Sequence, residues 1–254
     1  MTAWIVARKG LIHWRRNPAL VLGSLLYPMV MVLLFGFVFG SAMNVAGGGD
    51  YREFLMPGMY GQAMMLGVMS TMAIVTAEAS SGVTDRYRSM PVSMAGVVLG
   101  RSATEMVNTV LELAILIGCG LAVGWRFHLG VGNALVAVGL LLLVRFALIW
   151  VGIFLGLKIT PAAAGAAWMP LMPLTMLANT FVSPSQMPGW LGTISEWNPL
   201  SATVAACRTL FGNPGFSGDS WASQHALLLA VAWPLLIIAI FLPLSVRAYR
   251  RLSR

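Results

Sequence analysis

Six long apolar runs constrain this chain more than any other feature of its sequence. They lie at residues 19–40, 54–78, 101–123, 131–157, 162–182 and 227–246. Each is about 20 residues long or longer, which is the length of helix that crosses the hydrocarbon core of a bilayer. Only 9% of the residues are charged, compared with roughly 25% in an average soluble domain. We therefore predict an all-α integral membrane protein with six transmembrane helices, forming a single domain over residues 1–254.

Lysine and arginine are unevenly distributed among the loops that join these runs. With both termini in the cytoplasm, 12 of the 16 basic residues lie inside, three lie outside and Arg145 lies within a span. Positively charged loops stay in the cytoplasm, so this orientation is predicted and the opposite one is rejected. The net charge of +8 then reflects topology. It does not indicate nucleic-acid binding, because the positive residues sit at helix ends and form no single basic face.

The segment before the first run, residues 2–17, has the pattern of a helix that lies on a membrane surface. On a helix, Trp4, Ala7, Leu11 and Trp14 fall within an arc of about 80°, and the basic residues lie elsewhere. Tryptophan and arginine suit the lipid headgroup layer. We predict an N-terminal amphipathic surface helix here; the alternative is an ordinary basic flank of the first span.

The longest predicted outer segment, residues 183–224, is rich in proline and contains two apolar patches. These patches, 190–194 and 200–210, are too short to cross a bilayer. Short helices that enter the outer leaflet are expected if they pack against protein. The alternative is a folded outer loop without contact to lipid.

The sequence has none of the motifs that a membrane enzyme or an ATPase needs. It contains no G-x-S-x-G nucleophile motif, no H-E-x-x-H metal motif and no P-loop. His13, His128 and His225 are far apart in sequence. Work against a gradient therefore needs energy from a partner or from an ion gradient. An ion-driven transporter and, less favoured, a lipid-modifying membrane enzyme remain as alternatives.

Two charges, Glu112 and Arg145, lie deep within predicted spans. Glu112 is about 17 Å beyond Arg101, and Arg145 is about 18 Å before Leu157, at 1.5 Å per residue. Because an unpaired charge at this depth costs at least about 2.5 kcal/mol, we predict an intramembrane pair between them. Such a pair could clamp two helices together, or it could belong to a substrate path or a proton relay.

The connection between the second and third spans is the strongest local signal. Ser80 or Ser81 is suited to cap a short helix, and Pro91 is suited to end it. Between them lie the polar, charged and aromatic residues Thr84, Asp85, Arg86, Tyr87 and Arg88. Tyrosine and arginine are favoured at protein interfaces, although a solvated loop would have the same composition.

Four short motifs in this order resemble those of a known family. They are Arg-Arg-Asn-Pro at 15–18; Phe-Leu-Met-Pro-Gly at 54–58; Glu78, Gly82 and Arg86, followed by Met-Pro-Val at 90–92 and Leu-Gly-Arg at 99–101; and Asn-Pro-Leu at 198–200 with Arg208. The chain resembles the membrane subunit of ABC-2-type exporters, close to the daunorubicin-resistance permeases of actinobacteria. Met90 departs from the threonine or serine that this family often places before the coupling-site proline.

The resemblance implies a mechanism and a set of partners. Two membrane subunits, identical or paralogous, would pair in the bacterial plasma membrane, and two separate ATPase subunits carrying ATP and Mg would dock beneath them. This chain itself would bind no metal or cofactor. The exported compound would be an amphiphilic drug, an antibiotic or a lipid-like molecule.

The resemblance also implies roles for particular residues. A coupling helix at about 80–90 would contact the ATPase through residues 84–88, supported by Glu78, Gly82, Pro91 and Arg101. An outer gate within residues 183–224 would contain Asn198, Pro199 and Arg208.

Overall fold

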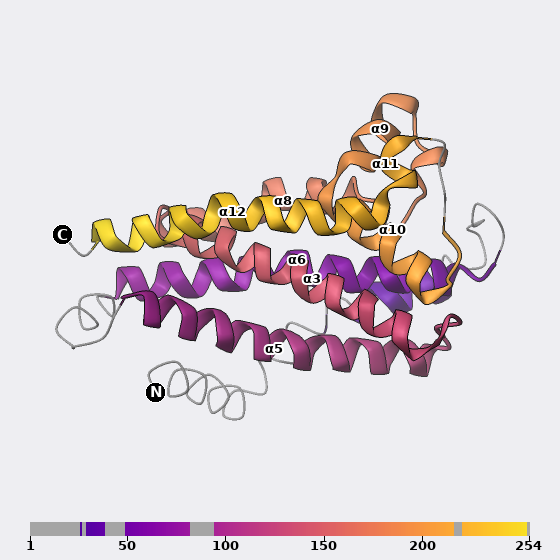
Figure 1. The fold of residues 1–254 in the computed structure, drawn as a ribbon, viewed down its shortest axis with the longest axis horizontal. Coiled ribbons are helices and arrows are strands. Elements are labelled where there is room, and N and C mark those ends of the chain that lie inside the picture. Colours follow the sequence, from indigo (N-terminus) through magenta and orange to yellow (C-terminus); the bar gives the residue numbers. More distant parts are fainter. Residues whose placement is uncertain (1–25, 27–28, 39–48, 82–93, 216–219, 253–254) are drawn as a thin grey trace.

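The computed structural model describes the chain except for residues 1–25, 27–28, 39–48, 82–93, 216–219 and 253–254. In the described part, long helices lie side by side along one axis, and short helices gather near one end of the bundle (Figure 1). The long helices are α3 (Tyr51–Ser80), α5 (Met94–Val123), α6 (Gly130–Gly156) and α12 (Ala226–Leu252). Following the predicted topology, we call the end at which α3 and α12 finish the inner end, and the opposite one the outer end.

The remaining described elements are short. They are the π-helical turn η1 (Leu34–Val38), α7 (Pro161–Ala166), α8 (Trp168–Met176), the 3₁₀ turn η2 (Pro184–Gln186), α9 (Gly189–Trp197), α10 (Pro199–Phe211) and α11 (Trp221–Gln224). Helices α9 and α10 form at the two apolar patches that the sequence predicts as short helices. Their position in the outer leaflet stays a prediction. The surface helix predicted at residues 2–17 lies outside the described residues.

Four helices in the described part are long and apolar enough to cross a membrane. They comprise Tyr51–Ser80, Leu99–Val123, Gly130–Gly156 and Ala226–Tyr249, and they correspond to four of the six predicted spans. Half of the predicted first span, residues 19–40, lies outside the described residues. The described helices therefore support a multi-pass membrane protein, while the full set of six spans stays a prediction.

The predicted fifth span, residues 162–182, differs from the expectation of one continuous helix. It is divided into α7 and α8, with a turn at Ala167 between them. Pro170 explains this break, because proline has no N–H to donate to the carbonyl oxygen of Ala166. Thr160 caps the start of α7 by accepting a hydrogen bond from the backbone N–H of Ala163 at 3.3 Å.

Helices α3 and α6 form the most closely packed seam of the bundle. A Cβ atom added to Gly152 would lie 2.9 Å from the Cβ atom of Thr71, and one added to Gly156 would lie 2.7 Å from the carbonyl oxygen of Met72. The Thr76 hydroxyl donates to the carbonyl oxygen of Gly156 at 3.0 Å. Small residues allow two helix backbones to approach in this way within a bilayer.

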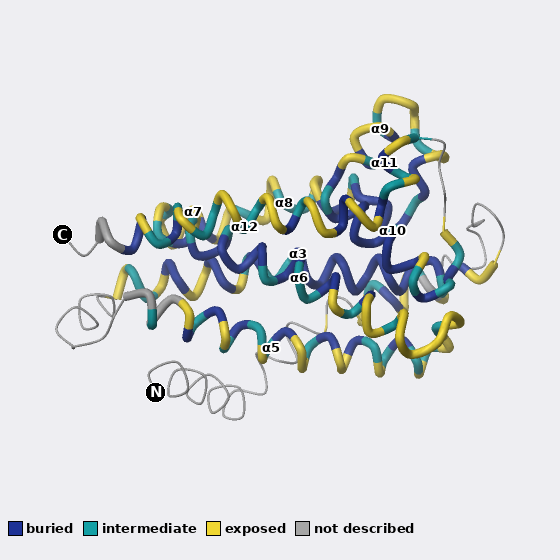
Figure 2. The backbone as a smooth tube through the Cα atoms, viewed as in Figure 1, coloured by how far each residue is buried: buried dark blue, intermediate teal, exposed yellow. Residues whose placement is uncertain are grey.

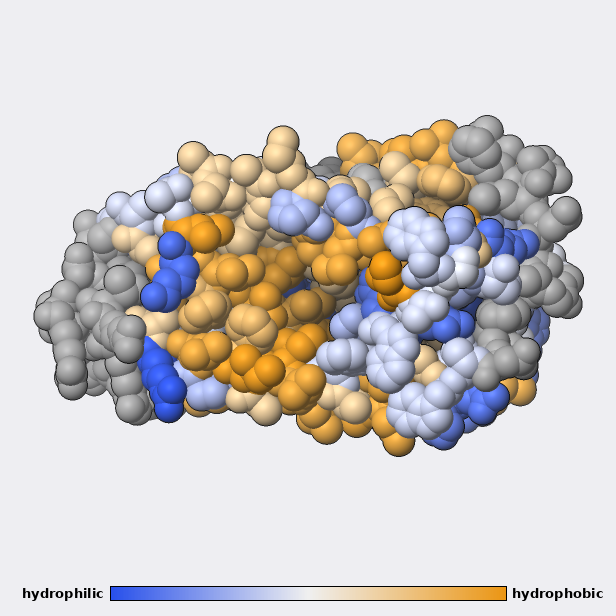
Figure 3. Space-filling model, turned by 90° about the horizontal axis from the view of Figure 1, so that it is seen from above, coloured by the Kyte–Doolittle hydropathy of each residue, from blue (hydrophilic) through white to orange (hydrophobic). Residues whose placement is uncertain are grey.

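The outward faces of the bundle are apolar. Buried residues line the contacts between α3, α6 and α10, whereas the outward faces of α5 and α12 are exposed (Figure 2). On α12, exposed residues include Leu227, Leu228, Val231, Leu235 and Leu236. Figure 3 shows a broad apolar surface in the middle of one face, with more polar residues toward both ends. This distribution suits a bundle surrounded by lipid, whose hydrocarbon region excludes unpaired polar groups.

Candidate functional site

A buried charged cluster joins α3, α5 and α6 about halfway along the bundle. Arg145 on α6 is 3% exposed. Its Nη2 donates to Oε2 of Glu105 and to Oγ1 of Thr71, both at 3.0 Å, and its Nε donates to Oγ1 of Thr109 at 3.3 Å. Gly67 makes room for this guanidinium, since a Cβ atom there would lie 2.6 Å from Cζ of Arg145.

The predicted pair between Glu112 and Arg145 is therefore corrected to a pair between Glu105 and Arg145. The prediction measured depth from Arg101, but α5 begins seven residues earlier, at Met94. Counted from the observed helix ends, Glu105 lies 11 residues from Met94, and Arg145 lies 11 residues from Gly156. The charges were rightly predicted to meet across antiparallel helices, and the error in one helix start shifted the partner by two turns.

A second ion pair joins the inner ends of α3 and α5. Nη1 of Arg101 donates to Oε2 of Glu78 at 2.6 Å. Because Glu78 lies before the segment 82–93 and Arg101 after it, the ion pair holds the two ends of that connection together. The other predicted coupling residues lie outside the described residues, and their role stays a prediction: Gly82, Thr84, Asp85, Arg86, Tyr87, Arg88 and Pro91.

At the outer end, Arg208 of α10 holds three separate parts of the chain together. Its Nε donates to the carbonyl oxygen of Phe54 at 2.9 Å, and its Nη2 donates to those of Asn179 at 2.8 Å and Thr180 at 3.2 Å. Its Cζ also lies 3.7 Å from the centroid of the Phe54 ring. The side chain is almost completely buried, so α3, the segment after α8 and α10 all meet at one guanidinium.

The charge of Arg208 is satisfied without a carboxylate among the described residues. Burial lowers the pKa of Arg208 to about 9, because the charged form loses contact with water. The group remains charged at neutral pH, and the carbonyl oxygens and the Phe54 ring stabilise this form. Burial likewise raises the pKa of the neighbouring Cys207 thiol to about 12, because the thiolate would lose contact with water.

The other two predicted gate residues set the start of α10. Oδ1 of Asn198 accepts a hydrogen bond from the backbone N–H of Leu200 at 2.9 Å, which caps the helix. Pro199 occupies the first helical position, where its missing N–H does no harm. Nδ2 of Asn198 also donates to the carbonyl oxygen of Leu174 on α8 at 2.9 Å. All three predicted gate residues thus lie where α10 begins or is anchored to the bundle.

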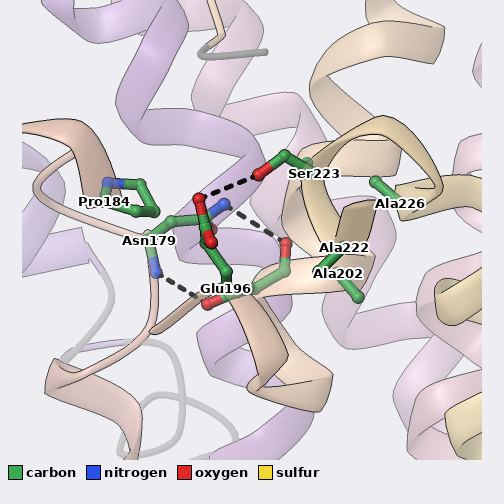
Figure 4. A pocket seen from close by; sticks show the side chains of 9 residues that line it. Asn179, Pro184, Glu196, Ala202, Ala222, Ser223 and Ala226 are labelled. Atoms are coloured by element: carbon green, nitrogen blue, oxygen red, sulfur yellow. Dashed lines mark hydrogen bonds between the residues drawn. The ribbon is translucent and has the colours of Figure 1, made fainter. Parts of the chain in front are cut away.

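A small pocket lined by both polar and apolar residues lies beside this anchor, between the short helices (Figure 4). The backbone N–H of Asn179 donates to Oγ of Ser201 at 3.0 Å, and Ser223 donates to Glu196 at 3.1 Å. The pocket is lined by Asn179, Pro184, Glu196, Ser201, Ala202, Ala205, Ala222, Ser223 and Ala226. Its hydrogen bonds therefore connect the segment after α8 to α10, and α9 to α11.

Sequence reasoning missed Glu105, Thr71, Thr109 and Asn179. The spacing of Glu105, Thr109 and Glu112 along α5 was an available signal, because residues four and seven apart share one helix face. No comparable pattern indicated Asn179. Within the described part of the chain, no three His, Cys, Asp or Glu side chains come together to hold a metal ion; the absence of a metal or cofactor stays a prediction.

Comparison with known proteins supports the interpretation of the fold. The family model described as "ABC-2 type transporter" matches residues 2–211. A daunorubicin resistance ABC transporter permease of Streptomyces coeruleorubidus is 29% identical over 95% of this chain and 83% of its own length. A probable doxorubicin resistance ABC transporter permease of Mycobacterium tuberculosis is 22% identical over 96% of this chain and 86% of its own.

A third relative comes from Porphyra purpurea. A putative transport permease of Porphyra purpurea is 24% identical over 82% of this chain and 73% of its own length. All three relatives are transport permeases, and the family model covers most of the chain, including Glu78, Arg101, Glu105, Arg145 and Arg208. The chain therefore belongs to the ABC-2 type transporter family.

Proposed function

We propose that this chain is the membrane-spanning permease subunit of an ATP-driven exporter. The observation that carries the proposal is the similarity to ABC transporter permeases along 95% of the chain. The names of these relatives refer to resistance to daunorubicin and doxorubicin. They support an amphiphilic drug, an antibiotic or a lipid-like compound as the exported substrate, moved out of the cell across the bacterial plasma membrane.

The energy comes from separate subunits, because this sequence has no P-loop. Two ATPase subunits bind ATP and Mg beneath a pair of permeases, which are two copies of this chain or this chain and a paralogue. The coupling residues 84–88 contact the ATPase. The pair between Glu78 and Arg101 joins the two helices that flank this contact, so movement of the contact passes to α3 and α5 together.

The outer gate is built from α10 and its anchors. Arg208 and Asn198 fix α10 to α3 and α8. Release of the compound on the outer side requires these segments to separate. The partners are therefore two ATPases, a second permease, lipid and the small amphiphilic substrate, and no nucleic acid.

The proposal is tested by purification and transport in parallel. A tagged full chain is extracted from its native membrane in mild detergent, and we expect an ATPase with a Walker motif to co-purify. Inside-out vesicles should accumulate drug with ATP. Arg86→Ala should reduce this transport while leaving membrane insertion intact, and Arg126→Ala, at the outer turn, serves as the control.

Two outcomes contradict the proposal. Transport that needs no ATP and stops when an ionophore collapses the ion gradient would favour the ion-driven transporter. Chemical turnover of lipid by the purified chain, without any partner, would favour the membrane enzyme.

A further inference from the structure

We propose that Glu112 is a second docking position for Arg145, so that the ion pair holding α5 to α3 and α6 exchanges between Glu105 and Glu112. The exchange itself stands on the packing of this chain. Only its role in transport rests on the proposed function. Glu112 is then a positioning residue that acts through Arg145.

The first observation is that the cluster leaves a donor and an acceptor unused. Nη1 of Arg145 is buried and has no hydrogen-bond partner. Glu112 lies two turns from Glu105 on α5 and forms no ion pair among the described residues. An unpaired carboxylate within a bilayer is unfavourable, so a nearby guanidinium with a free N–H group is its natural partner.

The second observation is the spacing along α5. Glu105 and Glu112 are seven residues apart, which places them about 20° apart around the helix and about 10 Å apart along it. Asn108 lies between them, and its Oδ1 is buried without a partner. A guanidinium moving outward along α5 therefore passes an acceptor on its way from one carboxylate to the other.

The third observation is that α5 is held more loosely than the helix pair that carries Arg145. In the most apolar 18-residue stretch of each helix, 44% of the residues are buried in α3 and 56% in α6, but only 22% in α5. Gly152 and Gly156 fix α6 against α3 at backbone distance. Arg145 therefore extends from a closely packed helix pair toward a less closely packed helix. Its guanidinium can turn between the two carboxylates of α5 while the ion pair between Glu78 and Arg101 keeps the inner ends of α3 and α5 together.

The charge balance is the same in both positions. With Arg145 at Glu105, Glu112 lacks the guanidinium, and with Arg145 at Glu112, Glu105 lacks it. The observed arrangement has in addition the hydrogen bonds of Thr71 to Glu105 and of Arg145 to Thr71 and Thr109, so it is the more stable of the two. Since α5 follows directly from the segment that contains the predicted coupling residues, a displacement of that segment selects between the two positions.

A double-mutant cycle on the purified full chain in lipid nanodiscs tests the exchange. We expect Glu105→Gln and Glu112→Gln each to lower the melting temperature modestly, because the remaining carboxylate still pairs with Arg145. The double variant should lose clearly more than the sum of the single losses. Glu112→Asp in the Glu105→Gln background, which keeps a carboxylate, should recover most of the difference. The matched control is Glu196→Gln, whose effect should be simply additive with that of Glu105→Gln.

If the double variant yields no folded protein, adding Arg145→Gln provides the decisive measurement. Removal of the stranded charge should restore folding. Additive losses in the cycle, or a Glu105→Gln variant as unstable as the double variant, would overturn the exchange. For its role in transport, Glu112→Gln should stay folded and bind the ATPase but lose most of its export. Normal export by this variant would overturn that role and leave the proposed permease function untouched.

Discussion

Two buried arginines satisfy their charges in different ways. Arg145 has a carboxylate and two hydroxyl groups, whereas Arg208 has backbone carbonyl oxygens and an aromatic ring. The sequence predicts that Arg145 needs a partner because it lies within an apolar run. It does not predict the surroundings of Arg208, since any residue can supply a carbonyl oxygen and only the folded chain brings Phe54 and Asn179 beside it.

Replacement of Arg208 by glutamine tests the outer anchor. The shorter side chain cannot reach all three carbonyl oxygens, and buried acceptors left unpaired are costly, so we expect a loss of about 2–4 kcal/mol in unfolding free energy. Thermal unfolding of the purified chain in detergent measures it. The control is Arg126→Gln, at an exposed position. Equal, small losses in both variants would contradict the anchoring role.

Gly67 has no room for an added side-chain atom beside the charged cluster. In Gly67→Ala the new methyl group meets the Arg145 guanidinium, and we expect a loss of about 1–3 kcal/mol. Gly139→Ala on α6 meets nothing within 4 Å, so it should be neutral or slightly stabilising, since alanine favours helix. Thermal unfolding of both variants distinguishes a steric effect from a general effect of glycine replacement.

At the scale of elements, apolar length predicted most of the long helices well. The spans predicted at 54–78 and 131–157 are observed as α3, Tyr51–Ser80, and α6, Gly130–Gly156. The predicted helix bounds were wrong where a helix boundary does not coincide with the end of an apolar run. The start of α5 lies before the apolar run, at Met94, and Pro170 divides a run that is long enough to span.

The ion pair between Glu78 and Arg101 should matter for coupling as well as for stability. The side chain of Glu78 is 38% exposed, but that of Arg101 is only 11% exposed. Glu78→Gln should therefore lower the unfolding free energy by about 1–3 kcal/mol and still leave the chain folded. In the folded variant, export per ATP hydrolysed should fall, because α3 and α5 no longer move together. Glu196→Gln, in the outer short helices, serves as the control. Unchanged export by Glu78→Gln would contradict a role in coupling.

At the scale of the whole molecule, topology is the property that the sequence predicts and that labelling can test. Reactive cysteines are placed in a background with Cys119→Ala; Cys207 can stay because its side chain is fully buried and out of reach of the reagent. We expect Ser217→Cys to react with a membrane-impermeant thiol reagent on intact cells. Ser253→Cys should react only after the cells are opened, and the reverse pattern would invert the topology.

The anchor at Arg208 has a consequence for the proposed outer gate. A single guanidinium bonds to α3 and to the segment after α8 while belonging to α10. If one of these segments moves away, the Arg208 side chain shifts with it and its hydrogen bonds to the other segments are lost as well. Unlocking is then concerted, and a partly open outer face, with one segment displaced and two retained, should be too rare to leak the compound back.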